Sequence, residues 1–180
     1  MTEKTEVATL AGGCFWCLET VYKRVKGVLE AIPGYSGGHV KYPAYEQVCS
    51  DTTGHAEAIQ IIFNPQIISY GEILKIFWQI HNPTTLNRQG NDFGTQYRSV
   101  IFYHDEGQKR VAHSSKKDLD DSCLWENPVV TEIIPFKEFY IAEEYHHDYF
   151  KNHPYNSYCQ FVVKPKLKKF IKDFKEYIEK

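Results

Sequence analysis

The chain has 180 residues, of which 42% are hydrophobic and 24% are charged, as is typical of one folded globular domain and unlike a disordered chain. Its formal net charge is −2 at pH 7, so no overall positive field is available to attract nucleic acid, and no such partner is expected. The sequence contains no run of about 18 apolar residues, the length that a membrane-spanning helix needs. The charged N-terminal stretch lacks the apolar core of a secretory signal. Five cysteines, an odd number, fit poorly with a disulfide-framed secreted domain, so we expect a cytoplasmic protein with reduced thiols.

The first half of the chain alternates between predicted strands, helices and a glycine-rich loop. Gly12-Gly13 separates the first strand from the first helix. Ser69 and Glu72 have the spacing of a capping box and begin the most clearly periodic helix. In chain order the predicted elements are a strand over 5–11, a helix over 14–25, a loop over 33–55, a strand over 58–63 and a helix over 69–80.

The second half continues this alternation without a repeat or a linker. Its predicted elements are a polar loop over 87–96, a strand over 97–103, a helix over 105–121, a strand over 129–135, extended segments over 139–142 and 158–163, a helical turn over 143–151 and a helix over 165–180. The pattern predicts one α+β domain over residues 1–180, a sandwich of a mixed sheet flanked by helices. Residues 164–180 are its C-terminal amphipathic helix, whose lysine-rich face is typical of a solvated surface and could also dock an acidic partner.

The segment Gly12-Gly13-Cys14-Phe15-Trp16-Cys17 carries the strongest chemical signal. A cysteine that follows a tight turn and begins a helix lies beside unpaired backbone N–H groups and the positive end of the helix dipole. Both favour the thiolate and are expected to lower the pKa of Cys14 below its usual value of about 8.5. Cys14 is therefore predicted to be a nucleophile rather than a buried structural cysteine.

The pair Cys14 and Cys17 fits two other kinds of site. A C-x-x-C at the start of a helix is typical of a thioredoxin-like dithiol exchanger, although the two aromatic residues between the thiols are bulky for that role. A zinc site completed by Cys49, Cys159 or a histidine is the other alternative. Structural zinc sites normally use a second closely spaced pair of ligands, which this sequence lacks, so no metal is expected.

The state of the Glu57 carboxyl group is not decided by the residues alone. Glu57 enters an apolar strand, where an ionised carboxylate is costly, so it is paired, exposed at the strand end, or kept protonated as a general acid. Pairing or exposure is the simpler interpretation.

The run of residues 143–147 contains two adjacent histidines. His146 and His147 would point to different sides of a helix, so solvent-facing or locally hydrogen-bonded histidines are expected rather than a metal site.

Five sequence blocks then occur in a fixed order: Gly13-Cys14-Phe15-Trp16, Gly34-Tyr35-Ser36-Gly37-Gly38, Tyr45-Glu46-Gln47-Val48-Cys49, Gly54-His55-Ala56-Glu57 and Gly94-Thr95-Gln96-Tyr97-Arg98-Ser99. A further stretch from Ala142-Glu143-Glu144-Tyr145-His146 to Tyr158-Cys159 continues the series. Each block alone is weak, whereas the series is specific. Together they resemble the peptide methionine sulfoxide reductases of the A type, over about residues 8–163. The resemblance implies the family's α+β sandwich, a ferredoxin-like fold.

The resemblance implies an enzyme that reduces methionine S-sulfoxide, free or in proteins, to methionine. Cys14 would attack the sulfoxide sulfur as a thiolate and be left as a sulfenic acid. Glu57 would be the protonated acid that serves the departing oxygen. Tyr45 and Tyr97 would donate hydrogen bonds to that oxygen, and Asp92 would support this polar network.

The same resemblance assigns the apolar side of the pocket and the partners. Phe15 and Trp16 would form the wall that receives the substrate methyl group, so that only the S epimer reacts. The family implies no cofactor and uses thioredoxin as reductant, and we expect a monomer.

A second thiol would then condense with the sulfenic acid and regenerate the enzyme. Cys159 matches the place of a recycling cysteine in the family, and Cys17, about one helical turn from Cys14, is the alternative. Cys49 and Cys123 are expected to be structural or incidental.

The sequence departs from the commonest family pattern in three places. Position 17 is Cys where many members have Gly, and His147 replaces a usual Gln. The glycine-rich tail with a further cysteine is absent, and the lysine-rich helix follows instead. The first and third departures leave the recycling route open without affecting the reductase step.

Overall fold

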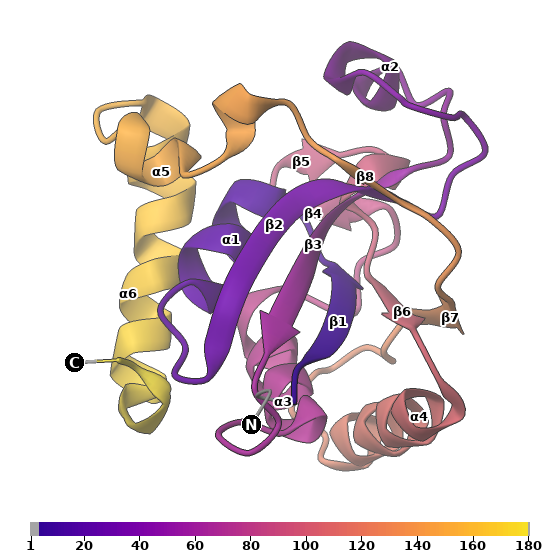
Figure 1. Ribbon diagram of the computed structural model, residues 1–180, viewed down its shortest axis with the longest axis vertical. Helices are drawn as coiled ribbons and strands as arrows, with labels where there is room; N and C mark the ends of the chain where they lie inside the picture. Colours follow the sequence, from indigo (N-terminus) through magenta and orange to yellow (C-terminus); the bar gives the residue numbers. More distant parts are fainter. Residues whose placement is uncertain (1–3, 180) are drawn as a thin grey trace.

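Residues 4–179 are described by the computed structural model, and their central feature is a βαββαβ unit folded around one sheet (Figure 1). In chain order the unit consists of β1 (Glu6–Ala11), α1 (Phe15–Tyr22), β2 (Val28–Ser36), β3 (Ala56–Phe63), α3 (Tyr70–Ile80) and β6 (Val100–Tyr103). Its strands pair antiparallel in the spatial order β6-β1-β3-β2. The prediction of an α+β sandwich with a mixed sheet is confirmed, and this strand order is that of a ferredoxin-like fold.

Further elements extend the sheet and cover it. The added strands are β4 (Arg88–Gln89), β5 (Asp92–Phe93), β7 (Glu132–Pro135) and β8 (Phe139–Ile141). Strand β7 runs parallel to β6 at one edge, β8 runs antiparallel to β2 at the other, and β4 and β5 form a separate hairpin. The other helices are α2 (Tyr45–Cys49), α4 (Glu106–Asp121), α5 (Tyr149–Asn152) and α6 (Lys164–Asp173), together with short 3₁₀ turns η1 (Thr95–Tyr97), η2 (Glu144–His146) and η4 (Lys175–Tyr177) and the π-helical turn η3 (Cys159–Val163).

The main hydrophobic core lies between the helices and one face of the sheet. Leu10, Ile59 and Ile61 of β1 and β3 are fully buried there against α1, α3 and α6. Figure 1 shows α1 and α6 side by side over this part of the sheet. Burying each such side chain contributes about 1.5–3 kcal/mol, so this face holds the sandwich together. The opposite face carries small residues such as Ala58 and is covered by the segment around Phe136 and Phe139.

The predicted loop over 33–55 ends correctly where β3 begins at Ala56, but two regular elements lie within its range. Strand β2 continues to Ser36, and residues 45–49 form α2. Pro33 and Gly34 are residue types that disfavour a strand, but both are compatible with their places in β2. The carbonyl of Pro33 accepts a hydrogen bond from the backbone of Ala142, and Gly34 lies so close to β8 that a Cβ there would be 2.4 Å from the Tyr140 carbonyl oxygen.

The C-terminal part also differs from its prediction. Residues 158–163, expected to be extended because of their β-branched and aromatic residues, form helical structure that includes η3 and runs directly into α6. Both edges of the sheet are already taken by β7 and β8, and η3 packs against α1 instead. The final helix ends at Asp173 rather than at residue 180, which lies outside the described residues; Ile178 pairs with Val25 in an isolated bridge.

The polar loop predicted over 87–96 contains β4, β5 and the start of η1. The other predicted strands and helices exist and differ mainly at their ends. The strands over 5–11 and 58–63 and the helices over 69–80 and 105–121 are confirmed as β1, β3, α3 and α4. The capping box is made as predicted, because Ser69 Oγ accepts from the Glu72 backbone at 3.2 Å while Glu72 Oε2 accepts from the Ser69 backbone at 2.8 Å. Helix α1 ends at Tyr22, strand β6 begins at Val100 and strand β7 begins at Glu132, each inside its predicted range. Residues 143–151, predicted as one helical turn, contain η2 followed by the start of α5.

Candidate active site

The turn between β1 and α1 brings Cys14 to the N-terminal end of α1. Cys14 is the N-cap residue, with an extended backbone, and its side chain makes no capping hydrogen bond. Gly13 has a φ of +87°, and a Cβ at this position would be 2.8 Å from Gln89, so the turn needs glycine for both its conformation and its packing. Cys14 is only 7% exposed, and it lies in one apolar cluster with Phe15, Cys17 and Cys159.

Glu57 is held beside this cysteine by the backbone of the next residue. It lies on β3 opposite Tyr35 of β2 and is 1% exposed. The backbone N–H of Phe15 donates a hydrogen bond to Glu57 Oε2 over 3.1 Å. Burial raises the pKa of Glu57 to about 8, and the charges of Asp92 and Cys17 act in the same direction, against the Phe15 hydrogen bond. Glu57 is therefore mostly protonated at neutral pH, which is the third of the states considered from the sequence.

The prediction of a lowered pKa for Cys14 is wrong for the resting site. Burial raises the pKa of Cys14 well above its ordinary value, and the hydrogen bond with Cys17 and the charge of Glu57 add to this. The helix terminus does act as expected, because the Trp16 backbone N–H lowers the pKa, but burial outweighs it. In the same pair, the hydrogen bond from Cys14 lowers the pKa of Cys17, against the effect of burial.

Aromatic side chains enclose the cluster. The Phe15 and Tyr35 ring centroids are 5.7 Å apart, and Trp16 stacks face to face on Tyr149 at 3.7 Å. Tyr158 meets the Trp16 ring edge-on, with centroids 5.7 Å apart. Together these rings give the space around Cys14 an apolar wall, as the resemblance implied for Phe15 and Trp16.

Two tyrosine hydroxyls and one carboxylate reach the same region. Tyr45 of α2 and Tyr97 of η1 pack against the cysteine cluster, and burial raises the pKa of each above its ordinary value, so both remain O–H donors. Asp92 of β5 accepts a hydrogen bond of 2.6 Å from the Tyr158 hydroxyl. The structure thus brings together all the residues that the sequence singled out for this site, including Glu57.

The cysteines divide into two groups. Cys159 of η3 is fully buried, and burial raises the pKa of its thiol, with the charge of Cys17 acting in the same direction. Cys49 and Cys123 are exposed. Cys49 is hydrogen-bonded to Tyr45 at the edge of the site, whereas Cys123 follows the C-terminal end of α4 and is not part of the cluster.

Sequence reasoning missed His146 as a part of the site. Expected to be solvent-facing or locally bonded, it is fully buried, and its Nδ1 accepts a hydrogen bond from the Trp16 indole N–H over 3.1 Å. Its ring also lies 4.5 Å from that of Tyr45. The block that ends at His146 was part of the resemblance, and this was the one available signal, because nothing in the local spacing links residues 130 positions apart.

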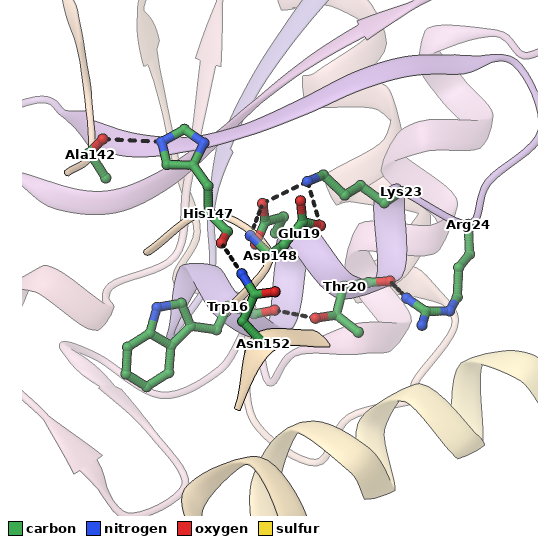
Figure 2. A network of polar contacts seen from close by, with 9 residues as sticks. All are labelled: Trp16, Glu19, Thr20, Lys23, Arg24, Ala142, His147, Asp148 and Asn152. Atoms are coloured by element: carbon green, nitrogen blue, oxygen red, sulfur yellow. Dashed lines mark hydrogen bonds and ion pairs between the residues drawn. The ribbon is translucent and has the colours of Figure 1, made fainter. Parts of the chain in front are cut away.

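The segment after β8 is fastened over α1 by a polar network, shown in Figure 2. The buried carboxylate of Glu19 accepts from the Asp148 backbone N–H at 3.0 and 3.1 Å, and Lys23 bridges Glu19 and Asp148 at 2.9 and 2.8 Å. His147 Nε2 lies 3.0 Å from the Ala142 carbonyl oxygen. These contacts hold the segment that carries His146 and Tyr149 against Trp16.

Two further features concern residues 4–179 only. Within this range, no group of three or more His, Cys, Asp or Glu side chains is arranged to hold a metal ion. None of the helices described there is both long enough and apolar enough to cross a membrane.

Comparison with known proteins identifies the family. The family model for peptide methionine sulfoxide reductase matches residues 6–178. Peptide methionine sulfoxide reductase MsrA from Saccharolobus solfataricus is 59% identical over 174 residues, which are 97% of each chain. The crystal structure of Mxr1 from Saccharomyces cerevisiae in reduced form superposes with a TM-score of 0.80 at 35% identity, over 88% of this chain and 91% of that one. The structure of Mxr1 in complex with Trx2 has a TM-score of 0.57 at 28% identity, over 83% and 87%.

The match spans nearly the whole chain and agrees with the local geometry around Cys14. It includes the glycine turn, the cysteine and the buried glutamate on β3. The chain is an oxidoreductase and belongs to the peptide methionine sulfoxide reductase family.

Proposed function

We propose that this chain reduces the S epimer of methionine sulfoxide, free or within proteins, to methionine, with Cys14 as nucleophile and Glu57 as general acid. The observation that carries the proposal is the hydrogen bond from the Phe15 backbone to Glu57, which holds a protonated carboxyl group beside the cysteine. A sulfoxide requires both groups at once, because its sulfur is attacked while its oxygen takes up a proton.

In the reductase step, the Cys14 sulfur bonds to the sulfoxide sulfur while Glu57 transfers its proton to the oxygen. The Cys14 proton passes to Cys17, to which Cys14 is hydrogen-bonded. The hydroxyl group then moves to Cys14, leaving a sulfenic acid, and methionine departs with an electron pair on its sulfur. The substrate sulfur is reduced by two electrons and Cys14 is oxidised by two.

The surrounding side chains orient the sulfoxide. Tyr45 and Tyr97 donate hydrogen bonds to its oxygen, and Asp92 keeps Tyr158 against the Trp16 wall. The methyl group faces Phe15 and Trp16. Exchanging the methyl group and the oxygen would leave buried donors unpaired, so the R epimer is rejected.

For recycling we propose a relay that uses both candidate cysteines. The Cys17 thiol condenses with the Cys14 sulfenic acid, which forms a disulfide and releases water. Cys159 then attacks the Cys17 sulfur, which frees Cys14 and leaves a Cys17–Cys159 disulfide. The hydrogen bond between Cys14 and Cys17 supports the first step, and the burial of Cys17 and Cys159 in one cluster supports the second. The expectation from the sequence that Cys159 pairs directly with Cys14 is the alternative.

The dithiol of thioredoxin is the proposed reductant of the final disulfide, returning Cys17 and Cys159 to thiols. The structure of yeast Mxr1 in complex with Trx2 supports this partner. Cys159 is fully buried, so η3 must move for the disulfide to be reached. η3 is a π-helical turn, a geometry that is uncommon and recurs at functional sites.

The test of the proposed function is loss of activity in Cys14→Ser with methionine S-sulfoxide as substrate and dithiothreitol as reductant. Cys123→Ser is the matched control, because it removes an exposed thiol outside the cluster. We expect methionine release to stop in the first variant and to continue in the second. Wild-type release of methionine by Cys14→Ser would refute the assignment.

A further inference from the structure

A groove of about 700 Å³ lies next to the proposed site, between the C-terminal end of α3, the β4–β5 hairpin and the η3–α6 segment. Its volume falls within the range of ligand sites. Trp125, Phe161 and Phe170 give it an apolar lining, and Phe161 is 81% exposed although it is a large aromatic residue. Lys166 and Lys169 of α6 line the same groove.

The groove borders the proposed methionine site. Asp92 and Tyr158 line it, and the hydrogen bond between them forms a shared wall. On the side of the methionine site, the Tyr158 ring contacts Trp16 edge-on. A chain that leaves the methionine pocket past Trp16 therefore meets this groove.

Lys166 is the unusual group in the groove. It is half-buried, yet within residues 4–179 its ammonium group has no hydrogen-bond or ion-pair partner. Lys23, by contrast, is paired with Glu19 and Asp148. A partly desolvated cation without a partner is unfavourable, and an anionic ligand would offset this cost. Of the carboxylates that line the groove, Asp92 is engaged by Tyr158.

We propose that this groove binds the polypeptide that flanks methionine sulfoxide in an oxidised protein, and that Lys166 and Lys169 select flanking acidic side chains. The inference rests on the proposed function and adds a preference among protein-bound methionine sulfoxides, namely for those with acidic neighbours. The apolar lining suits side chains of an extended or unfolded segment, while the two lysines attract carboxylates. Asp173 also lines the groove and is exposed, so its negative charge would weaken the preference for acidic side chains.

The test compares kcat/KM for three capped peptides that contain one methionine S-sulfoxide, flanked by aspartates, by serines or by lysines. Dithiothreitol is the reductant, and the comparison is repeated with thioredoxin in its place. We expect the aspartate peptide to exceed the serine peptide by about fivefold at low salt, and the difference to shrink as salt screens the lysines. In Lys166→Glu the order should reverse in favour of the lysine peptide. Lys168→Glu is the matched control, because Lys168 is an exposed neighbour on α6 that does not line the groove.

The outcomes separate this proposal from the proposed function. Equal kcat/KM for the three peptides in the wild type would overturn the groove proposal, as would an acidic preference that survives in Lys166→Glu or is lost equally in Lys168→Glu. An effect of Lys166→Glu seen only when thioredoxin replaces dithiothreitol would assign the groove to the reductant and also overturn it. Failure of the wild type to reduce any of the peptides or free methionine S-sulfoxide would instead contradict the proposed function.

Discussion

The Phe15 backbone N–H donates a 3.1 Å hydrogen bond to Oε2 of Glu57, and this contact joins the first turn of α1 to β3 at the centre of the sheet. One carboxyl oxygen is thereby fixed, which leaves the other to carry the proton toward the substrate. The same contact takes up a helix N-terminal N–H that would otherwise need a partner. The contact thus fixes the position of the acid, while burial keeps it protonated against the effect of this hydrogen bond.

Glu57→Gln should slow methionine release in a single turnover by about 10²–10⁴-fold, because an amide keeps the shape and the Phe15 contact but is a far poorer proton donor. Rapid-quench measurement of methionine formed per enzyme gives the rate. Glu30→Gln, an exposed carboxylate on β2, is the control and should react like the wild type. An unchanged rate in Glu57→Gln at neutral pH would remove Glu57 from the acid role.

The pKa of about 8 for Glu57 predicts a pH dependence of stability. The unfolded chain has the ordinary value of about 4.3, so between these values the folded state binds more protons. The free energy of unfolding contributed by Glu57 is therefore fully present below about pH 4.3 and is lost as the pH rises through 8, by at most about 1.4 kcal/mol per unit. Urea unfolding of wild type and Glu57→Gln at pH 5 and pH 8 isolates this effect. Parallel pH profiles for the two proteins would show that Glu57 is not buried as a neutral acid.

The relay predicts which disulfide accumulates. After one equivalent of methionine S-sulfoxide and no reductant, peptide mass mapping should find Cys17 joined to Cys159 in the wild type. Cys159→Ser should complete one turnover, stop at the Cys14–Cys17 disulfide and fail to cycle with thioredoxin. A Cys14–Cys159 disulfide in the wild type, together with normal cycling in Cys17→Ser, would favour the direct pairing expected from the sequence.

Stereospecificity should depend on the indole wall. With racemic methionine sulfoxide, the wild type should consume the S half and leave the R half. Trp16→Ala should lower kcat/KM for the S epimer by at least about tenfold, since the methyl group loses its apolar contact. Tyr42→Ala, an exposed aromatic residue outside the cluster, is the control. Chiral chromatography of the remaining substrate measures both effects, and reduction of both epimers by the wild type would contradict the assigned pocket.

Gly34→Ala should destabilise the fold by about 1–3 kcal/mol, because its Cβ would be 2.4 Å from the Tyr140 carbonyl oxygen and from the Phe139 ring. Gly71→Ala is the matched control. Gly71 lies in the first turn of α3, where a Cβ would make only ordinary contacts at 3.9 Å, and alanine there should stabilise by up to about 1 kcal/mol. Urea denaturation compares the two variants. Equal stabilities would show that β8 can shift without cost.

Local signals predicted the parts of the fold that are decided locally. The capping box at Ser69 and Glu72 sets the start of α3 because both of its hydrogen bonds lie within one turn. Residues 158–163 were predicted incorrectly, because β-branched residues favour a strand only where a sheet edge is free. Strand β2 was not predicted, since the tolerance of Pro33 and Gly34 within it depends on their partners in β3 and β8.

By itself, the amino-acid sequence determined the chemistry available to this protein: a cysteine after a two-glycine turn at a helix start, and an ordered set of motifs that carry the family's acid, donors and aromatic wall. Only the tertiary structure decided the state of those groups. Burial keeps the Cys14 thiol protonated against the effect of its helix terminus and raises the pKa of Glu57 to about 8. The tertiary structure also brings His146 into hydrogen-bond contact with Trp16, 130 positions away in the sequence. The physical reason is that desolvation depends on what surrounds a group in space, whereas residue spacing reports only what lies next to it along the chain.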